Sequence, residues 1–345
     1  MSSCGSPEGD VTEDHVDEED RNGGRRSSDR VAISAVVPCF NECLVIDELY
    51  RRLIAVLKQV AGDSHEMIMV NDGSTDQTWS LIRRLIREDP HVVGVDLSKN
   101  HGHQLAITAG LFHSRGDRVV VLDADLQDPP ELICDMMQLM AREQADVVYG
   151  RRIRRMGETW FKRTSAHLFY AVLSRLSATD IPSDVGDLRV MSARVVEILN
   201  SMAEQHRFLR GLVPWIGFKQ VPFDYDRQQR AAGTTKYSKR RMARLALDAL
   251  TSFSLAPLRM SIYVGFTAAV VALSLAAYAI VLTILGHTIS GWASLIAVVL
   301  FMGGSQLVVT GVLGEYIGRI HEQTQNRPLF IVREVVRSEV RTARP

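Results

Sequence analysis

The longest uncharged stretch of the chain limits what the whole protein can fold into. From Met260 to Gly314 there are 55 residues without Asp, Glu, Lys or Arg. A helix that spans a membrane needs about 20 apolar residues, so this stretch has room for two. We place the spans at residues 260–285 and 292–313, with residues 286–291 as the hairpin between them. The alternative is a pair of buried core helices, which soluble proteins seldom build from uncharged stretches of this length.

Lys and Arg side chains flank the two spans but are absent from the hairpin. They are Lys236, Lys239, Arg240, Arg241, Arg244 and Arg259 before the first span, and Arg319, Arg327, Arg333 and Arg337 after the second. Positive flanks stay on the cytoplasmic side, so we expect a protein of the inner (plasma) membrane with both termini in the cytoplasm. Residues 237–258 form a basic, partly amphipathic segment expected in the membrane interface, although a plain linker helix is the alternative. Residues 319–345 are expected to be a cytoplasmic tail.

The first 29 residues differ in composition from the rest of the chain. They contain nine acidic and three basic side chains and almost no large apolar ones, which predicts a disordered acidic tail without a signal peptide. The remaining residues carry 37 basic and 31 acidic side chains, and this net charge of +6 is weak support for an anionic partner. Four cysteines in 345 residues exclude a disulfide scaffold and fit a reducing compartment.

Residues 30–236 show the pattern of an α/β domain. Short runs rich in Val and Ile predict buried strands at residues 31–37, 66–70, 92–96, 118–122 and 146–149. Apolar side chains with helical spacing predict helices at residues 44–60, 78–87, 104–113 and 131–142. This alternation predicts parallel βαβ units and an open, mostly parallel twisted sheet flanked by helices. Such sheets bind ligands beyond the carboxyl ends of their strands.

Polar motifs follow three of these strands at the point where each strand ends. The first strand runs into PCFNE (residues 38–42), the second into NDGSTDQT (71–78) and the fourth into DADLQDPPE (123–131). Because the carboxyl ends of parallel strands meet at one edge of a sheet, the three motifs should converge there. This convergence predicts a single ligand site.

The carboxylates of these motifs suggest what the site binds. Asp123 and Asp125 are costly to keep ionised side by side unless a cation lies between them, and oxygen ligands suit Mg²⁺ or Mn²⁺. The alternative is a turn in which an Asp only caps the next helix. Asp72 can accept hydrogen bonds from a ribose or a base edge, whereas Asp76 suits a helix start. Glu42 is either a helix-start acid or a nucleotide contact.

The order of the motifs resembles glycosyltransferase family two. The segments that carry this resemblance are PCFNE, NDGSTDQT, LSKNHGHQLAITAGL and GDRVVVLDADLQDPPEL. Later segments resemble the polyprenyl-phosphate glycosyltransferases, a group related to dolichol-phosphate mannose synthase; they are VYGRR, SDVGDLRVMS, HRFLRGLVPWIGF and RAAGTTKYSKRRMARLALDALTSFSLAPLR. The two C-terminal spans fit the bacterial members of that group. The resemblance covers roughly residues 31–325.

The resemblance implies a GT-A type domain that uses a nucleotide-sugar donor, a divalent metal and a polyprenyl phosphate acceptor. The residues it assigns to the donor nucleotide are Pro38, Asn41, Glu42 and Asp72. It assigns Asp123 and Asp125 to the metal and the donor diphosphate, with Gln127 close by. The sequence departs from the family at Cys43, where an acid is common, and at His101, where an aromatic residue is common. It also departs in GDLR and AGTTKY, so donor preference is less certain than activity.

The acceptor phosphate needs basic side chains around it. A phosphate monoester is largely ionised at neutral pH because its second pKa is about 6, and it is repelled by the donor diphosphate. The candidates to offset this repulsion are Arg151, Arg163, Arg210 and Lys236. Arg151 lies in GRRIRR, which is alternatively a solvated basic face, and Lys236 lies in a Gly-containing loop that alternatively reaches lipid headgroups. Asp187 resembles the family's acceptor-side aspartate, which orients the sugar, acts as a weak base or caps a turn.

These observations predict an inverting transfer of a sugar, preferably from a UDP-sugar, to undecaprenyl phosphate on the cytoplasmic leaflet. Asp125, Asp187 and Lys236 are the expected catalytic residues. The product would serve cell-envelope glycan or lipid modification, and a separate flippase would move it across the membrane. The alternatives are a processive polysaccharide synthase, whose Q-x-x-R-W motif is missing here, and a non-catalytic membrane-anchored nucleotide-sugar binder or scaffold.

The sequence also bears on macromolecular partners. A nucleic-acid partner is not expected, because the basic residues crowd towards the membrane and form no patch interleaved with aromatic side chains. Small residues in and just after the second span permit close helix contact and are compatible with a homo-oligomer; they are Gly303, Gly304, Gly311 and Gly314.

Overall fold

The computed structural model describes residues 30–152, 185–205, 207–226, 256–286 and 291–338. The strands are β1 (Val31–Cys39), β2 (His65–Asn71), β3 (Val92–Leu97), β4 (Gly116–Val121), β5 (Val147–Arg152), β6 (Val185–Ser192), β7 (Gln220–Tyr225) and β8 (Val332–Arg337). The helices are α1 (Ile46–Ala61), α2 (Thr78–Glu88), α3 (His103–His113), α4 (Leu132–Glu143), α6 (Ala193–Ser201), α7 (Leu209–Ile216), α9 (Ala256–Ile284) and α10 (Trp292–Thr324). The predicted tail 1–29 and most of the segment 237–258 lie outside the described residues.

The sheet has eight strands in the order β7-β5-β6-β4-β1-β2-β3-β8. Its centre, β4-β1-β2-β3, is parallel, and all five predicted strands and four predicted helices are present with small shifts at their ends. The prediction of an α/β domain with a mostly parallel sheet is therefore confirmed. The central strands are covered on both faces, which explains their near-continuous apolar sequences.

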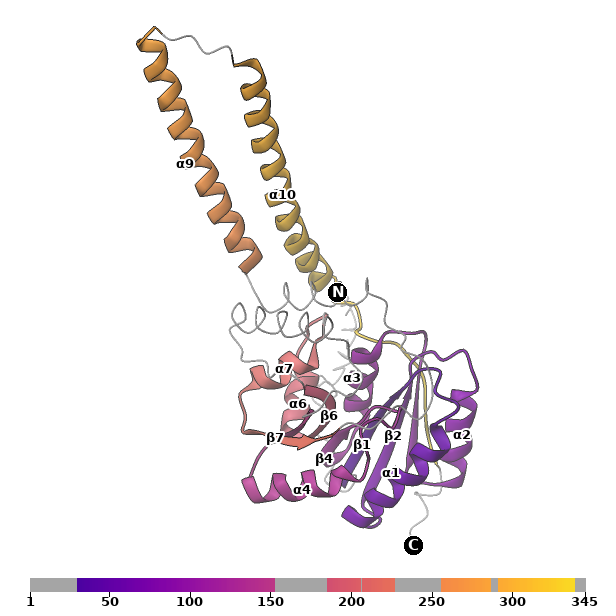
Figure 1. Ribbon diagram of the computed structural model, residues 1–345. Coiled ribbons are helices and arrows are strands. Elements are labelled where there is room, and N and C mark those ends of the chain that lie inside the picture. The colour runs from indigo at the N-terminus through magenta and orange to yellow at the C-terminus, as the bar shows by residue number, and fades with distance from the viewer. Residues whose placement is uncertain (1–29, 153–184, 206, 227–255, 287–290, 339–345) are drawn as a thin grey trace, which may run out of the picture. The chain divides into compact units, whose positions relative to one another are not determined.

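Helices cover both faces of this sheet (Figure 1). Apolar side chains of α1, α2 and α4, such as Leu53, Ile82 and Met136, pack in one core on one face. Those of α3, α6 and α7 pack in a second core on the other face. Gly110 lets α3 approach β1 closely, because a Cβ at this position would collide with the side chain of Val36.

Two strands that the sequence analysis did not predict run antiparallel to their neighbours. β6 lies between β4 and β5, and β8 pairs with β3 at the edge of the sheet. The expectation that residues 319–345 form a tail outside the domain is therefore corrected, because residues 332–337 are part of the sheet. The sequence VREVVR mixes charged and apolar side chains over six residues, and such a short edge strand has a weak hydrophobic signal.

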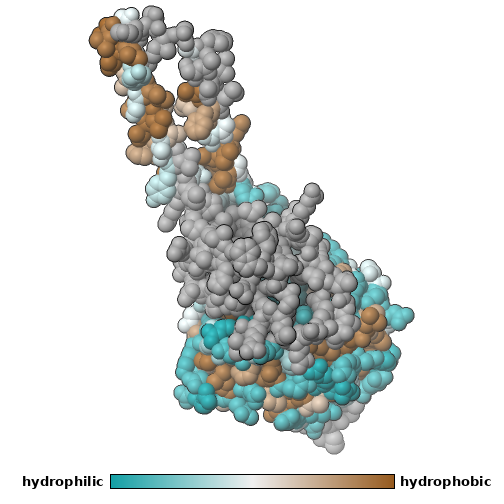
Figure 2. All heavy atoms as spheres, viewed as in Figure 1, coloured by the Kyte–Doolittle hydropathy of each residue, from teal (hydrophilic) through white to brown (hydrophobic). Residues whose placement is uncertain are grey.

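The two C-terminal helices contain the predicted spans and are longer than predicted. α9 begins before residue 260, and α10 continues beyond residue 313 to Thr324. Large apolar side chains are exposed on both, including Phe266 (71%), Leu273 (75%) and Leu307 (75%), as Figure 2 shows in brown. Within the described residues, one segment, Ser261–Leu282, is long and apolar enough to cross a membrane. A hairpin of two spans therefore stays a prediction.

Glu66 ties the new edge strand to the middle of the sheet. Its buried carboxylate accepts hydrogen bonds from Ser34 Oγ at 2.6 Å and Arg115 Nη2 at 2.9 Å, and Arg337 Nη1 of β8 lies 3.4 Å away.

A Glu66→Gln variant should lower the free energy of unfolding by about 3 kcal/mol, because both arginines lose their anionic partner. Urea unfolding in detergent checks this. Glu48→Gln, which breaks an exposed pair with Arg51, should change stability by less than about 0.5 kcal/mol.

Candidate active site

The sheet topology explains why distant segments meet at one edge. The motifs after β1, β2 and β4 lie at adjacent carboxyl ends, because these strands are parallel neighbours. β6 and β8 run in the opposite direction, so their beginnings lie at the same edge as those motifs. Asp187 is the third residue of β6 and therefore lies at the same edge of the sheet as the motifs that follow the parallel strands.

Hydrogen bonds connect the loop after β1 to the loop after β2. Asn41 Oδ1 accepts a hydrogen bond from Thr75 N at 2.8 Å, and Asn41 N donates to Ser74 Oγ at 3.0 Å. Asn41 adopts a positive φ of 55°, which Asn tolerates better than most residues. Glu42 N donates to Thr78 Oγ1 at 2.9 Å, while Pro38 is buried within β1. Asn41 and Glu42 thus join the loop after β1 to the loop after β2, which begins with Asp72.

Asp72 organises the loop that follows β3. Its carboxylate accepts hydrogen bonds from His101 N at 2.7 Å and Gly102 N at 3.0 Å. Burial is the largest influence and raises the pKa of Asp72, although the two backbone donors oppose it. The next residue must be glycine, because Gly73 has a φ of +65° and a Cβ there would collide with the backbone at Lys99 and Asn100. In this structure Asp72 therefore supports the loop that faces the predicted donor site.

The DADLQD segment forms a tight, acidic turn after β4. Asp125 is buried, with 8% exposed, and accepts a hydrogen bond from Gln127 N at 3.1 Å. Leu126 between them has a φ of +56°, which is uncommon for a bulky residue and indicates a locally strained turn. Asp128 is fully buried, and its carboxylate accepts hydrogen bonds from Tyr225 Oη at 2.6 Å and Arg152 Nη2 at 3.2 Å. Arg152 of β5 and Tyr225 of β7 thus fix the end of this turn through Asp128.

His103 joins two of the predicted site carboxylates, and the sequence analysis did not identify it. Its Nε2 lies 3.0 Å from Asp187 Oδ2 and 3.3 Å from Asp123 Oδ1. Desolvation lowers the pKa of His103, but the hydrogen bond to Asp187 and the charges of both aspartates outweigh it and raise the pKa to about 9. Its position at the start of α3, directly beyond β3, is the signal that would have identified it.

Asp187 is the most densely paired carboxylate of the site. Arg210 grips it with two parallel hydrogen bonds, Nε to Oδ1 at 3.0 Å and Nη2 to Oδ2 at 2.8 Å. Burial raises the pKa of Asp187, but the charges and hydrogen bonds of Arg210 and His103 outweigh burial and hold that pKa well below its usual range. A carboxylate held in this way is a poor proton acceptor, so the geometry favours an orienting role over a base.

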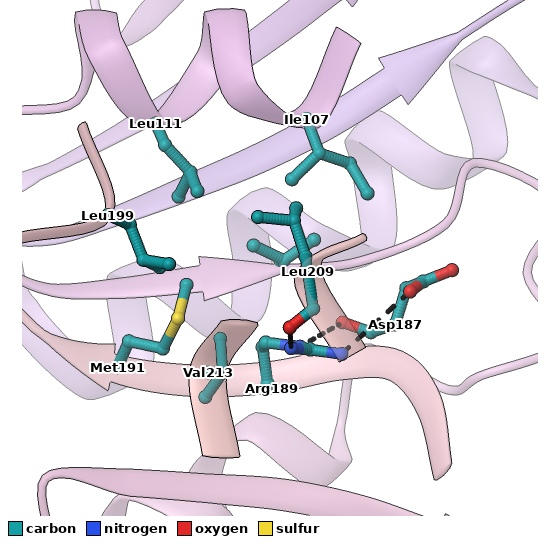
Figure 3. A pocket seen from close by; sticks show the side chains of 9 residues that line it. Ile107, Leu111, Asp187, Arg189, Met191, Leu199, Leu209 and Val213 are labelled. Carbon is teal, nitrogen blue, oxygen red and sulfur yellow. Dashed lines mark hydrogen bonds and ion pairs between the residues drawn. The ribbon is translucent and has the colours of Figure 1, made fainter. Parts of the chain in front are cut away.

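Arg189 supports Asp187 from inside the domain (Figure 3). It is 4% exposed, and its guanidinium donates to the backbone oxygens of Leu209 at 3.2 Å and Gly186 at 3.2 Å. Apolar side chains from α3, α6 and α7 surround it, including Ile107 and Val213. Arg189 thereby joins the beginning of β6 to the beginning of α7, which carries Arg210. The low exposure lowers the pKa of this guanidinium to about 10, mainly by desolvation.

The donor set at the sheet edge fits a divalent cation in part. Asp123 Oδ1 is buried and accepts no hydrogen bond from the described residues, although His103 Nε2 lies 3.3 Å away, so it is a hard oxygen that a cation could take as ligand. Burial raises the pKa of Asp123 to about 6, and the neighbouring carboxylates contribute to the rise, which a cation would reverse. Ligand atoms of His103, Asp123 and Asp187 lie within 4.8 Å of one another. A protonated His103 has no free lone pair, however, so Asp123 and Asp125 are the better ligands.

Arg151 and its neighbour Arg152 lie in different surroundings. Arg151 forms an exposed ion pair with Asp224, its cross-strand partner in β7, with Nε to Oδ1 at 2.5 Å. Successive side chains of a strand point to opposite faces, so Arg152 lies on the other face, beside Asp128 and Tyr225. A contact of Arg151 with the acceptor stays a prediction, and Arg152 is a second candidate because its side chain lies beside the acidic turn.

Two further predicted site residues lie outside the described part of the chain. They are Arg163, within residues 153–184, and Lys236, within residues 227–255. Of the other predicted residues, Arg210 lies on α7 beside Asp187, and Gln127 lies in the acidic turn next to Asp125.

Comparison with known proteins gives a consistent group of relatives. Residues 34–199 match the model of glycosyl transferase family 2. The chain is 43% identical over 308 residues to the uncharacterized glycosyltransferase YkcC of Bacillus subtilis (strain 168), covering 89% of this chain and 95% of that protein. It is 39% identical over 304 residues to the prophage bactoprenol glucosyl transferase homolog of Escherichia coli (strain K12), covering 88% of this chain and 99% of that protein.

Solved structures show a weaker similarity. The mannosyltransferase PcManGT from Pyrobaculum calidifontis, solved with GDP-Man and Mn²⁺, is 19% identical, with a TM-score of 0.45. The similarity covers 65% of this chain and 64% of that one.

Proposed function

Because the chain belongs to glycosyltransferase family 2, we propose that it transfers a sugar from a nucleoside-diphosphate sugar to a polyprenyl phosphate. The observation that carries this proposal is the match to the bactoprenol glucosyl transferase homolog along 99% of that protein, well beyond the family's catalytic segment. Bactoprenol glucosyl transferases of Shigella flexneri and its phage SfII are also 38% identical over 303 residues. The names of these relatives favour glucose as the first sugar to test, and a UDP-sugar stays the expected donor.

The donor diphosphate would bind at the acidic turn with Mg²⁺ or Mn²⁺. Asp123 and Asp125 would hold the metal, and the buried Oδ1 of Asp123, which accepts no hydrogen bond from the described residues, supports this assignment. When bound, the metal would supply positive charge that stabilises the leaving diphosphate. The nucleotide would lie over the loops after β1 and β2, where Asn41 and Asp72 hold the backbone in place. Glu42 and Gln127 are predicted to contact it, and Pro38 lies in the buried part of β1 that leads to this loop.

The acceptor phosphate would enter from the side of β5, β6 and α7. It is a dianion at neutral pH, so it needs no strong base but does need nearby cations. Arg152 and Arg210 supply positive charge at this side, and Arg163 and Lys236 remain predicted contributors from outside the described residues. Asp187 would orient the sugar or the arginine rather than accept a proton. Direct attack of the phosphate oxygen on the anomeric carbon would invert its configuration.

Membrane attachment would bring the site to its lipid acceptor. The apolar segment Ser261–Leu282 of α9 supports one span, and the exposed apolar side chains of α10 support a second. The basic flanks would keep both ends, and hence the catalytic domain, on the cytoplasmic side. The transfer would then take place on the cytoplasmic leaflet, and a separate flippase would have to carry the product across.

A donor screen tests the proposed function. Purified full-length protein in detergent is mixed with undecaprenyl phosphate, Mg²⁺ or Mn²⁺, and radiolabelled UDP-glucose, UDP-N-acetylglucosamine, GDP-mannose or other UDP- and GDP-sugars. We expect label from one donor to appear in the lipid extract and to disappear when the metal is removed with EDTA. Donor binding without transfer to the lipid from any sugar would contradict the proposal and favour a non-catalytic nucleotide-sugar binder.

A further inference from the structure

The chain returns from α10 to the edge of the catalytic sheet, next to the loops of the proposed donor site. β8, drawn in yellow in Figure 1, pairs with β3 in antiparallel fashion, with Leu97 opposite Val332. Because β8 is antiparallel, its first residues lie at the edge where β3 ends. Residues 331–333 therefore lie beside the loop formed by residues 98–102.

Two buried side chains, Asp96 and Asn71, connect Arg333 to the loops after β1 and β2, which we call the donor loops together with the loop after β3. Its Nη1 donates to Asp96 Oδ2 at 2.8 Å, and Asn71 Nδ2 donates to the other carboxylate oxygen of Asp96 at 2.6 Å. Asn71 Oδ1 accepts a hydrogen bond from Ser74 N at 3.2 Å. Ser74 Oγ in turn accepts from Asn41 N at 3.0 Å. A continuous series of hydrogen bonds thus runs from β8 to the residue that joins the loops after β1 and β2.

The same segment also supports the loop that Asp72 holds. Arg333 Nη2 donates to Ser98 O at 2.9 Å, and Ser98 N donates to Ile331 O at 2.9 Å. Ile331 N lies 3.4 Å from His101 Nε2. The backbone N–H of that His101 is the donor nearest to Asp72, at 2.7 Å from its Oδ1. Residues 331–333 are therefore connected to the proposed nucleotide surface in two ways, through Asp96 and through the loop formed by residues 98–102.

We propose that Ile331 and Arg333 form a C-terminal brace that positions the donor loops, with Arg333 as its positioning residue. This inference rests on the proposed function, because it takes the loops after β1, β2 and β3 as the nucleotide surface. Arg333 would act through Asp96 and Asn71 and would not itself contact the nucleotide-sugar. Residues 331–333, which follow the predicted second span, would then help to hold the nucleotide-binding loops in position.

The burial of Asp96 explains why an exposed arginine can have this effect. The side chain of Arg333 is 60% exposed, but that of Asp96 is only 1% exposed. Without the guanidinium, Asn71 Nδ2 is the side-chain donor to the buried carboxylate of Asp96 that remains among the described residues. A buried carboxylate that loses a charged partner draws in water or other donors, and the neighbouring loops must shift to provide them. The expected consequence is weaker nucleotide binding rather than a slower chemical step.

A matched pair of variants separates positioning from simple anchoring of β8. Arg333→Gln removes the brace, whereas Arg337→Gln removes the anchor to Glu66 at the other end of the same strand. Full-length proteins are purified in detergent, and UDP and GDP are titrated calorimetrically with Mg²⁺. Thermal unfolding and steady-state kinetics are measured alongside.

We expect Arg333→Gln to raise the Kd of the bound nucleotide and the KM of its sugar donor about tenfold, with kcat changed less than about twofold. Arg337→Gln should lower the melting temperature at least as much and leave Kd unchanged. Arg333→Lys, which keeps the charge but not the forked contact to Asp96 and Ser98, should fall between wild type and Arg333→Gln. Equal Kd values for wild type and Arg333→Gln, or equal losses in both Gln variants, would overturn the brace alone. Wild-type protein that binds neither nucleotide would overturn the proposed function as well.

Discussion

An Asp125→Asn variant should lose sugar transfer by about 10²- to 10³-fold in kcat, with little change in folding. Asn can still accept the hydrogen bond that Gln127 N donates to Asp125 Oδ1 at 3.1 Å, so the turn keeps its shape. The charge that would bind the metal is lost, however, and the leaving diphosphate loses its main stabilising cation. Radiolabel transfer to undecaprenyl phosphate, measured over a range of Mn²⁺ concentrations, gives both kcat and the apparent metal affinity.

Asp117→Asn is the matched control for this prediction. Asp117 is an exposed acid near the beginning of β4, whereas Asp125 follows the end of the same strand. The control should transfer sugar at the wild-type rate, and both variants should unfold close to the wild-type temperature. If Asp125→Asn were as active as Asp117→Asn at every metal concentration, Asp125 would not be a metal ligand.

The central half of the fold was predictable because its strands and helices are locally periodic. Parallel strands that are buried on both faces leave continuous apolar runs, such as residues 66–70, and their helices show one apolar face. β6 and β8 left no comparable signal, because their sequences VGDLRVMS and VREVVR mix charged and apolar side chains. β8 pairs with β3 across more than 230 residues, and its mixed sequence VREVVR is typical of an exposed edge. Only the assembled sheet shows that these strands run antiparallel.

The candidate site divides in the same way. Asp123 and Asp125 were predictable, because the end of a parallel strand places its following residues at the ligand edge. The choice between Arg151 and Arg152 depends on the alternation of β5, and the pairing with β6 shifts register between Tyr149 and Arg151. One residue of difference decides which face an arginine reaches. The position of His103 at the start of α3 indicates the ligand edge, but its pairing with Asp187 could not be predicted without knowing where β6 lies.

Replacing Arg210 with Gln should reduce kcat by about 10²-fold and leave nucleotide binding unchanged. Arg210 fixes both oxygens of Asp187, and a second partner of Asp187, His103, also lies 3.3 Å from Asp123. Without Arg210, the buried carboxylate and the imidazole must find a new arrangement on the acceptor side of the proposed site. The donor surface around Asn41 and Asp72 is built from other contacts and should keep its affinity for UDP.

Arg194→Gln provides a control with the same geometry in a different place. Arg194 also forms two parallel hydrogen bonds to one carboxylate, Nε to Asp146 Oδ1 at 2.9 Å and Nη2 to Oδ2 at 2.8 Å. Its side chain is 59% exposed, so loss of this pair should leave kcat at the wild-type value. Arg210→Lys keeps the charge without the forked grip and should recover only part of the rate. Transfer assays well below the unfolding temperature, together with UDP titrations, measure both effects. Equal kcat values for Arg210→Gln and Arg194→Gln would show that the pairing of Asp187 does not position the acceptor side for transfer.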